Sequence, residues 1–197
     1  MSLQEIAYQV ADAFFGEDVP ADTLKQIVYD TLSFDAPVVN VNGAINTLEL
    51  FHGPTLAFKD MALTVLPYLM VESKKLSGFP KKTLILTATS GDTGGAALSG
   101  FKDVDDVFIV VLYPTKGVSP FQASQMNYYT GKNAMAISVE GNFDDCQNLV
   151  KKVFTSDIKL KNYELSSANS INIGRLVPQI VYYVYAYAKL SQNEEIV

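Results

Sequence analysis

The sequence has only one cysteine and one histidine in its 197 residues. A lone cysteine, Cys146, excludes an intrachain disulfide and is typical of a reducing compartment, so we expect a cytoplasmic location. Because His52 is the only histidine, there is a single candidate to activate a cysteine nucleophile. We therefore expect Cys146 to be a packed apolar side chain.

An excess of positive charge and long apolar runs are also lacking. The net charge of −6 argues against nucleic-acid binding driven by overall charge. No apolar run is long enough to cross a bilayer, and no basic-then-apolar leader opens the chain. A content of 48% hydrophobic and 18% charged residues is typical of a globular protein with one or two domains. We expect no nucleic-acid partner, no membrane partner and no metal site.

One stretch, residues 49–60, joins a β-like run, a Gly-Pro turn and a helix start. The apolar residues that follow recur at helical spacing, and we expect one continuous helix from Phe58 to about Lys75. Lys59 then lies in or just before the first turn. The field of the helix N-terminus, with partial burial, should lower the pKa of its amine and supply the neutral form that attacks carbonyl groups. The alternative is a solvated pair of Lys59 and Asp60.

The segment from His52 to Asp60 closely resembles the cofactor-lysine segment of the threonine synthases. The resemblance implies that Lys59 is catalytic, that it holds pyridoxal 5'-phosphate as a Schiff base, and that its freed amine moves protons on the substrate. It also implies a carbon–oxygen lyase of threonine biosynthesis that converts O-phospho-L-homoserine and water into L-threonine and phosphate. Serine/threonine dehydratases and phospho-lyases of the same fold are the alternative. His52 would order the pocket or serve as a structural residue.

Helical spacing in the first 32 residues predicts two helices, and two short strands, 37–41 and 46–51, flank a hairpin-type turn. Beyond Lys82 the pattern alternates between strand and helix, which predicts a parallel α/β sheet with helices on both faces. Sites in such sheets lie at the carboxyl ends of the strands. The predicted strands are 83–88, 107–113, 134–139 and 164–167.

We predict three parts along the chain. Residues 1–81 would form an N-terminal domain that carries the cofactor lysine, and residues 82–170 a small parallel α/β domain. Residues 171–197 would form a long helix, kinked at Pro178, that leads toward a further part. By resemblance, the whole is an incomplete tryptophan synthase β-like fold, fold type II of the pyridoxal-phosphate enzymes.

A loop of small residues and glycines, residues 87–96, follows the first predicted strand of the sheet. Backbone N–H groups in such a loop, at a helix N-terminus, form an anion site; a turn that only lets helix and strand approach is the alternative. The glycine spacing fits neither a dinucleotide fingerprint nor a P-loop. The loop resembles the substrate-carboxylate loop of fold type II enzymes, which implies this role for Ser90, Gly91, Thr93 and Gly94. The resemblance also places Asp92 near the cofactor 3-hydroxyl.

Two more strand-end loops carry polar residues that we expect to face the same crevice. In residues 113–120, Lys116 and the following helix start could hold a phosphate, or Lys116 could be a solvated loop lysine. In residues 166–175, polar side chains crowd a helix start, and N-capping explains part of this without a ligand. The resemblance to threonine synthases assigns Lys116, Asn169, Ser170 and Arg175 to the phosphate of a phosphorylated amino-acid substrate.

The segment from Gly141 to Phe143 is similar to a glycine-rich phosphate cradle, but Asp144 and Asp145 follow it and would repel a phosphate. We therefore interpret residues 141–147 as structural. The cradle and the Ser/Thr that faces the pyridine nitrogen in the family are not found before Val197. We expect an N-terminal fragment that folds, binds pyridoxal phosphate weakly or not at all, lacks activity, and pairs as a homodimer.

Overall fold

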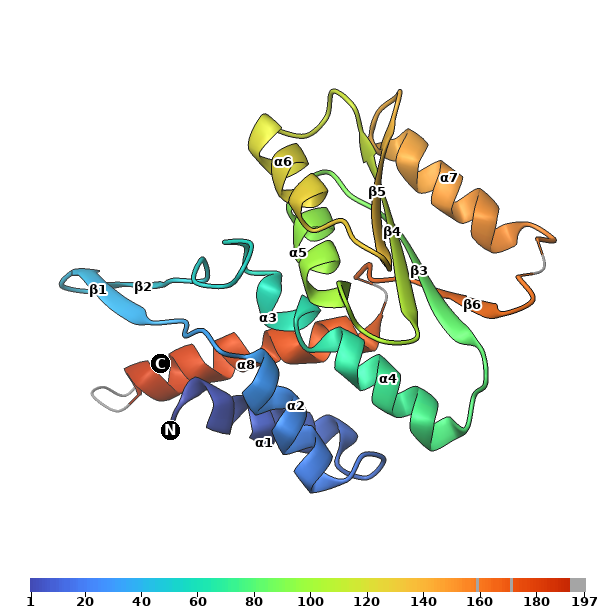
Figure 1. Cartoon of the computed structure of the whole chain (residues 1–197). Helices are drawn as coiled ribbons and strands as arrows, with labels where there is room; N and C mark the ends of the chain where they lie inside the picture. The colour runs from blue at the N-terminus through green and yellow to red at the C-terminus, as the bar shows by residue number, and fades with distance from the viewer. Residues whose placement is uncertain (159, 171, 192–197) are drawn as a thin grey trace.

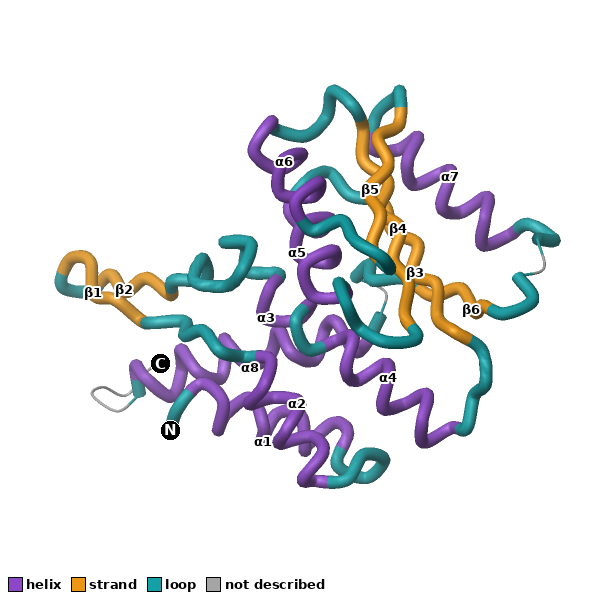
Figure 2. The backbone as a smooth tube through the Cα atoms, viewed as in Figure 1, coloured by secondary structure: helices purple, strands orange, loops and turns teal. Residues whose placement is uncertain are grey.

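The computed structural model describes residues 1–158, 160–170 and 172–191 (Figure 1). The chain opens with two helices, α1 (Leu3–Phe15) and α2 (Ala21–Thr31), as predicted. An antiparallel hairpin follows, built from β1 (Val38–Asn42) and β2 (Ile45–Leu48). Its turn contains Gly43 at φ 53°, a backbone conformation that glycine adopts without steric cost. The hairpin extends away from the helices (Figure 2).

The helix expected after Lys59 is two helices, so the prediction of one continuous element was wrong. The first, α3 (Asp60–Leu63), has four residues, and the second, α4 (Leu66–Ser77), begins two residues later. Pro67 lies in the first turn of α4. Proline has no backbone N–H and its ring clashes with the preceding turn, so a helix starts at this position more easily than it runs through it.

Four parallel strands form the sheet in the order β5-β4-β3-β6, which confirms the predicted fold class (Figure 1). β3 and β4 are the central strands, and β3 pairs with β6 despite their separation in sequence. The boundaries of these four strands agree with the predicted ones to within one residue, whereas the second hairpin strand, predicted to reach residue 51, ends at Leu48. The strands are β3 (Lys82–Ala88), β4 (Val107–Pro114), β5 (Ala134–Val139) and β6 (Tyr163–Ser166).

Helices cover both faces of this sheet. On one face lie α5 (Asp92–Phe101) and α6 (Pro120–Tyr128), and on the other lies α7 (Phe143–Thr155) (Figure 1). The α5 face packs a core that includes Ile85, Phe101 and Ile109. Cys146, a buried residue of α7, packs with Leu86 and neighbouring apolar residues, which confirms its expected packing role. Burial raises the pKa of the Cys146 thiol and so disfavours the reactive thiolate.

The long helix α8 (Ile173–Leu190) contains Pro178 and runs back to the N-terminal helices, where it packs against α1, α3 and α4. A second apolar core therefore joins α1, α2 and α8. The three-part division at 81/82 and 170/171 stays a prediction, and residues 171 and 192–197 of its last part lie outside the described residues. Among the described helices, none has the length and apolarity needed to cross a bilayer.

Candidate functional site

Two of the three strand-end loops meet in one cavity at the carboxyl end of the sheet. The cavity has a volume of about 560 Å³ and lies between the loop after β3, the loop after β6, the start of α8, and α7. Ser90 and Thr93 come from the first loop and the start of α5, and Asn169 and Ser170 come from the second loop. A hydrogen bond of 2.7 Å from Thr87 Oγ1 to Asn169 Oδ1 ties β3 to the second loop. The adjacency of β3 and β6 brings these distant residues together.

The start of α5 leaves some of its backbone donors free. The hydroxyl oxygen of the buried Thr89 accepts hydrogen bonds from the amides of Gly91 and Gly94, at 3.0 and 2.9 Å. Among the described residues, no acceptor is recorded for the amides of Ser90, Asp92 and Thr93. The free N–H groups of a helix start attract anions, so these three donors suit a carboxylate. The amides of Gly91 and Gly94 serve to shape the loop.

Asp92 is fixed by a residue that sequence analysis missed. Gln122, in the first turn of α6, donates from Nε2 to Asp92 Oδ1 at 2.7 Å. Its Oε1 accepts from the Ser119 amide at 3.0 Å, as the second half of a capping box. Gly91 has φ 152°, and a Cβ at this position would overlap the Gln122 side chain. The capping-box pattern Ser119-x-x-Gln122 can be read from the sequence, but its contact with Asp92 cannot.

Arg175 is the only arginine in the sequence, and 6% of its surface is exposed. Its guanidinium donates from one terminal nitrogen to the Ala168 carbonyl at 2.8 Å, and the other terminal nitrogen lies 3.5 Å from Thr93 Oγ1. The buried Nε has no hydrogen-bond partner among the described residues. Burial lowers the pKa of the guanidinium, although an arginine keeps its charge at neutral pH. A buried cation with an unused donor is suited to an anionic ligand.

Lys116 is not brought to this cavity. It lies in the exposed loop between β4 and α6, and it is not among the residues that line the cavity of Asn169, Ser170 and Arg175. The predicted convergence of three loops is therefore seen for two of them. The role of Lys116 in binding a phosphate stays a prediction.

Three side chains on one face of α6 hold the segments on either side of the predicted site. In addition to the Gln122 bond to Asp92, Gln125 Nε2 donates to the Thr55 carbonyl at 3.0 Å. Tyr129, the residue that follows α6, donates from its hydroxyl to the Pro54 carbonyl at 2.9 Å. The spacing of these residues is that of one helical face. The segment that leads to Lys59 and the loop that carries Asp92 thus depend on the same helix.

The residue after the lysine, Asp60, is buried and bonded to Thr55. Asp60 is 1% exposed, and its carboxylate accepts from the Thr55 amide at 2.8 Å and from the Thr55 hydroxyl at 2.6 Å. Burial raises the pKa of Asp60, and the hydrogen bonds from Thr55 oppose this. The alternative of a solvated Lys59–Asp60 surface pair is therefore wrong, because Asp60 is buried and bonded to Thr55.

Lys59 is the N-cap residue of α3 and is half-buried. Its pKa is lowered, first by burial and then by the charge of Arg175, while the charge of Asp92 raises it. The pKa of Lys59 is therefore shifted in the predicted direction. The cause differs, because a four-residue helix such as α3 has little macrodipole and burial contributes most. The amine lies 4.7 Å from the centre of the Phe58 ring.

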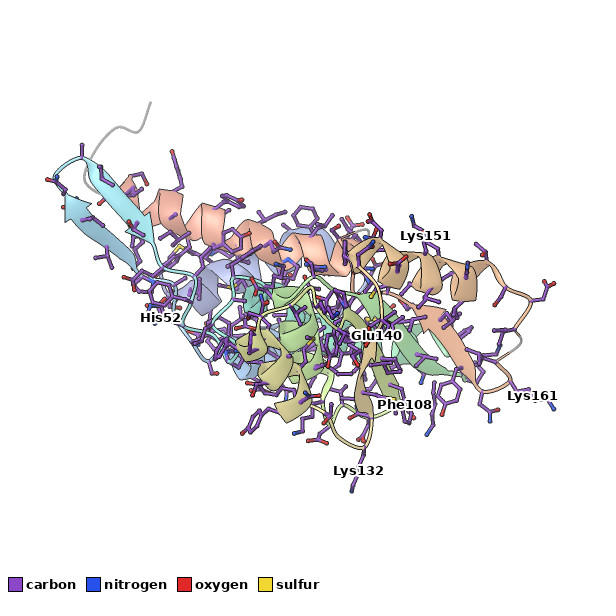
Figure 3. The ribbon with its side chains drawn as sticks, turned by 90° about the horizontal axis from the view of Figure 1, so that it is seen from above. His52, Phe108, Lys132, Glu140, Lys151 and Lys161 are labelled. Atoms are coloured by element: carbon purple, nitrogen blue, oxygen red, sulfur yellow. The ribbon has the colours of Figure 1, made fainter. Side chains whose placement is uncertain are left out.

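His52 and the 141–147 segment have structural contacts. His52, labelled in Figure 3, lies in the exposed part of the lysine segment. Its Nε2 lies 2.7 Å from Glu49 Oε2, and its ring stacks on Phe51. Asn142 caps α7 by accepting from the Asp145 amide at 3.1 Å, which supports the structural interpretation of this segment. Gln147, the last residue of the 141–147 segment, nevertheless lines the cavity together with other residues of α7. Sequence analysis missed this wall of the cavity.

The chain is similar in sequence and structure to threonine synthases. It is 44% identical over 186 residues to the threonine synthase of Serratia marcescens, covering 94% of this chain and 42% of the relative. A crystal structure of a PLP-bound threonine synthase from Brucella melitensis superposes with a TM-score of 0.84 at 43% identity, covering 96% of this chain and 41% of that one. The crystal structure of the yeast threonine synthase superposes with a TM-score of 0.86 at 35% identity, covering 99% of this chain and 41% of that one.

These similarities confirm the resemblance and the fold class expected from the sequence. No protein-family model matches the chain. The chain spans about two-fifths of the length of the curated relatives it matches.

Proposed function

We propose that this chain is part of a threonine synthase, the lyase that converts O-phospho-L-homoserine and water into L-threonine and phosphate with pyridoxal 5'-phosphate. The observation that carries the proposal is the 44% identity to a threonine synthase over 94% of this chain. The similarity includes the Lys59 segment and both loops of the cavity. Structures at 35–43% identity share the fold over nearly the whole chain.

The residues of the site fit the cofactor's aldehyde end and an anionic substrate. Burial lowers the pKa of the Lys59 amine and favours its neutral, nucleophilic form. The charge of Asp92 acts on this amine, and Gln122 keeps that carboxylate in place. When bound, pyridoxal phosphate supplies an electron sink for carbanion chemistry.

The chain's own groups would bind the substrate's carboxylate and phosphate and transfer its proton. The free amides of Ser90, Asp92 and Thr93 would bind the substrate carboxylate at the start of α5. Arg175, with its unused Nε, would bind the substrate phosphate together with Asn169 and Ser170. Lys59 is the group with a lowered pKa that would take and return a proton.

Chemical trapping tests the assignment of Lys59. The chain is incubated with pyridoxal phosphate, reduced with borohydride and digested for peptide mapping by mass spectrometry. Because we expect this chain to bind pyridoxal phosphate weakly, the reduced adduct should form at low yield, but on Lys59 in preference to the other lysines, and it should be lost in Lys59→Ala. Lys116→Ala, which removes an exposed loop lysine, is the control and should keep the adduct on Lys59. An adduct spread over exposed lysines would contradict the proposal.

Substrate protection separates a threonine synthase from a serine dehydratase of the same fold. O-phosphohomoserine should slow the trapping of Lys59, because the groups proposed for its phosphate and carboxylate line the cavity and the charge of one of them, Arg175, acts on the Lys59 amine. Homoserine, which has no phosphate, and serine should protect less at equal concentration. Stronger protection by serine would favour the dehydratase.

A further inference from the structure

One wall of the cavity is unexplained by the proposed function. The wall is α7, from which Phe143, Gln147, Val150 and Lys151 line the same cavity as Arg175. Gln147 and Lys151 are four residues apart and so lie on the same face of the helix. Lys151 is labelled on α7 in Figure 3. Gln147 is half-buried and Lys151 is exposed, and they are the polar groups that α7 contributes to the cavity.

The charge of the cavity is positive in a chain that is negative overall. The net charge is −6, yet no aspartate or glutamate is among the residues that line this cavity. Its two cations are Arg175 and Lys151, and Lys151 forms no ion pair within the described part of the chain. Arg175 is buried with an unpartnered Nε, so the site has donor capacity that the protein itself does not use.

We propose, resting on the proposed function, that Lys151 and Gln147 complete the site that binds the substrate's phosphate. A phosphate monoester is close to a dianion at neutral pH and has several acceptor oxygens, so one buried arginine leaves charge and acceptors unmatched. Lys151 supplies a second, mobile point charge, and Gln147 supplies amide donors. In this proposal Lys151 supplies the second cation of the cavity, whose lining does not include Lys116.

A matched pair of lysines tests this inference. Lys151→Ala and Lys152→Ala each remove one positive charge from α7, but only Lys151 lines the cavity. Inorganic phosphate is titrated into the full chain by isothermal calorimetry at low and moderate salt. We expect Lys151→Ala to weaken phosphate binding about tenfold, the loss of one charge-assisted hydrogen bond, and Lys152→Ala to leave it nearly unchanged. Lys116→Ala should also leave it nearly unchanged.

Further variants keep the result interpretable. Lys151→Gln retains most of the aliphatic stem and should weaken phosphate binding like Lys151→Ala, whereas a general packing defect would be milder in this variant. Gln147→Ala should weaken binding less than the loss of the lysine charge. Equal effects of Lys151→Ala and Lys152→Ala, a larger effect of Lys116→Ala, or no phosphate binding by the unmodified chain would overturn the inference. Trapping of Lys59 by pyridoxal phosphate would still report separately on the proposed function.

Discussion

The amine of Lys59 lies where three influences on its pKa meet. Burial and the charge of Arg175 lower the pKa, and the charge of Asp92 raises it. Between the lowered pKa and the ordinary value, the unfolded chain binds more protons at this position than the folded chain. The contribution of this group to the free energy of unfolding therefore increases as pH rises through that window. Below the window both states are protonated, and the folded state carries the cost of the buried charge.

The first prediction concerns the reactivity of this amine. Only the neutral amine reacts with acylating reagents, so Lys59 should be modified at lower pH than an exposed lysine such as Lys132. Competitive labelling across a pH series, read by mass spectrometry, gives the midpoint of each lysine. Asp92→Asn removes the charge that raises the pKa and should move the Lys59 midpoint further down. A Lys59 midpoint equal to that of Lys132 would contradict the assignment.

The second prediction concerns Asp60. Asp60→Ala removes the acceptor of the Thr55 amide and hydroxyl, and each group left buried without a partner costs ~1–3 kcal/mol. Asp60→Asn keeps an acceptor and offers an amide donor to the hydroxyl, so it should lower the free energy of unfolding much less. Urea denaturation of both variants compares these costs. Equal destabilisation by the two variants would mean that the charge, and not the hydrogen bonds, stabilises this segment.

At the scale of the elements, α5 packs at very close range against α3, the short helix that follows Lys59. A Cβ at Gly100 would overlap the carbonyl oxygen of Leu63 in α3, whereas a Cβ at Gly95 would make ordinary contacts with Gln125. Both glycines lie in α5. The helix can therefore lie against α3 only because position 100 has no side chain.

The third prediction compares these two glycines of α5. Gly100→Ala should lower the free energy of unfolding by ~1–3 kcal/mol, because the added methyl group must push α5 and α3 apart. Gly95→Ala should raise it by ~0.5–1 kcal/mol, since alanine loses less conformational entropy than glycine in a helix. Thermal unfolding followed by circular dichroism measures both variants. The packing explanation fails if Gly100→Ala is as stable as Gly95→Ala.

At the scale of the whole molecule, α8 links the two ends of the described chain. The hydroxyl of Tyr185 donates to Asp35 Oδ1 at 3.1 Å, across 150 residues of sequence. Tyr185 is buried, and burial together with the nearby Asp35 raises the pKa of its phenol. Tyr187, two residues further along α8, is 61% exposed. The helix therefore contributes both a buried bonded tyrosine and an exposed one.

The fourth prediction uses this contrast. Tyr185→Phe removes one buried hydrogen bond and should lower the free energy of unfolding by about 1 kcal/mol. Tyr187→Phe should change it by less than about 0.5 kcal/mol, as is typical of surface substitutions. Guanidinium denaturation of the two variants gives the comparison. A Tyr187→Phe effect as large as that of Tyr185→Phe would indicate a general role of the phenols in α8.

The fifth prediction concerns self-association, which follows from the hairpin. β1 and β2 form a sheet of two strands with open edges, and Val41 and Ile45 are 64% and 60% exposed. Open strand edges with apolar side chains favour pairing with another chain. We expect a concentration-dependent dimer in sedimentation velocity that Val41→Ser with Ile45→Ser weakens. Phe121→Ser, at a 61% exposed residue of α6, should leave it intact. A monomer at every concentration would rule out this dimer.

Local patterns in the sequence were sufficient for most of the elements and their type. The apolar run 83–88 matches β3 closely, because a central strand covered on both faces needs most of its side chains to be apolar. The position of Lys59 at a helix start and the burial of Cys146 follow from local spacing in the same way. Pro67 is a sequence signal for the break between α3 and α4. The helical spacing of the apolar residues nevertheless favoured one continuous helix.

Only the tertiary structure decided which polar groups meet. The Gln122–Asp92 bond spans 30 residues and the approach of Arg175 to Thr93 spans 82, and neither distance is set by a local period. The pairing of β3 with β6 brings Asn169 to the loop after β3, while Lys116 remains outside the cavity. The packing of α7 on the other face of the sheet adds Lys151 to the cavity. Hydrophobic periodicity specifies which face of an element is buried, and it carries no information about which distant side chain lies opposite.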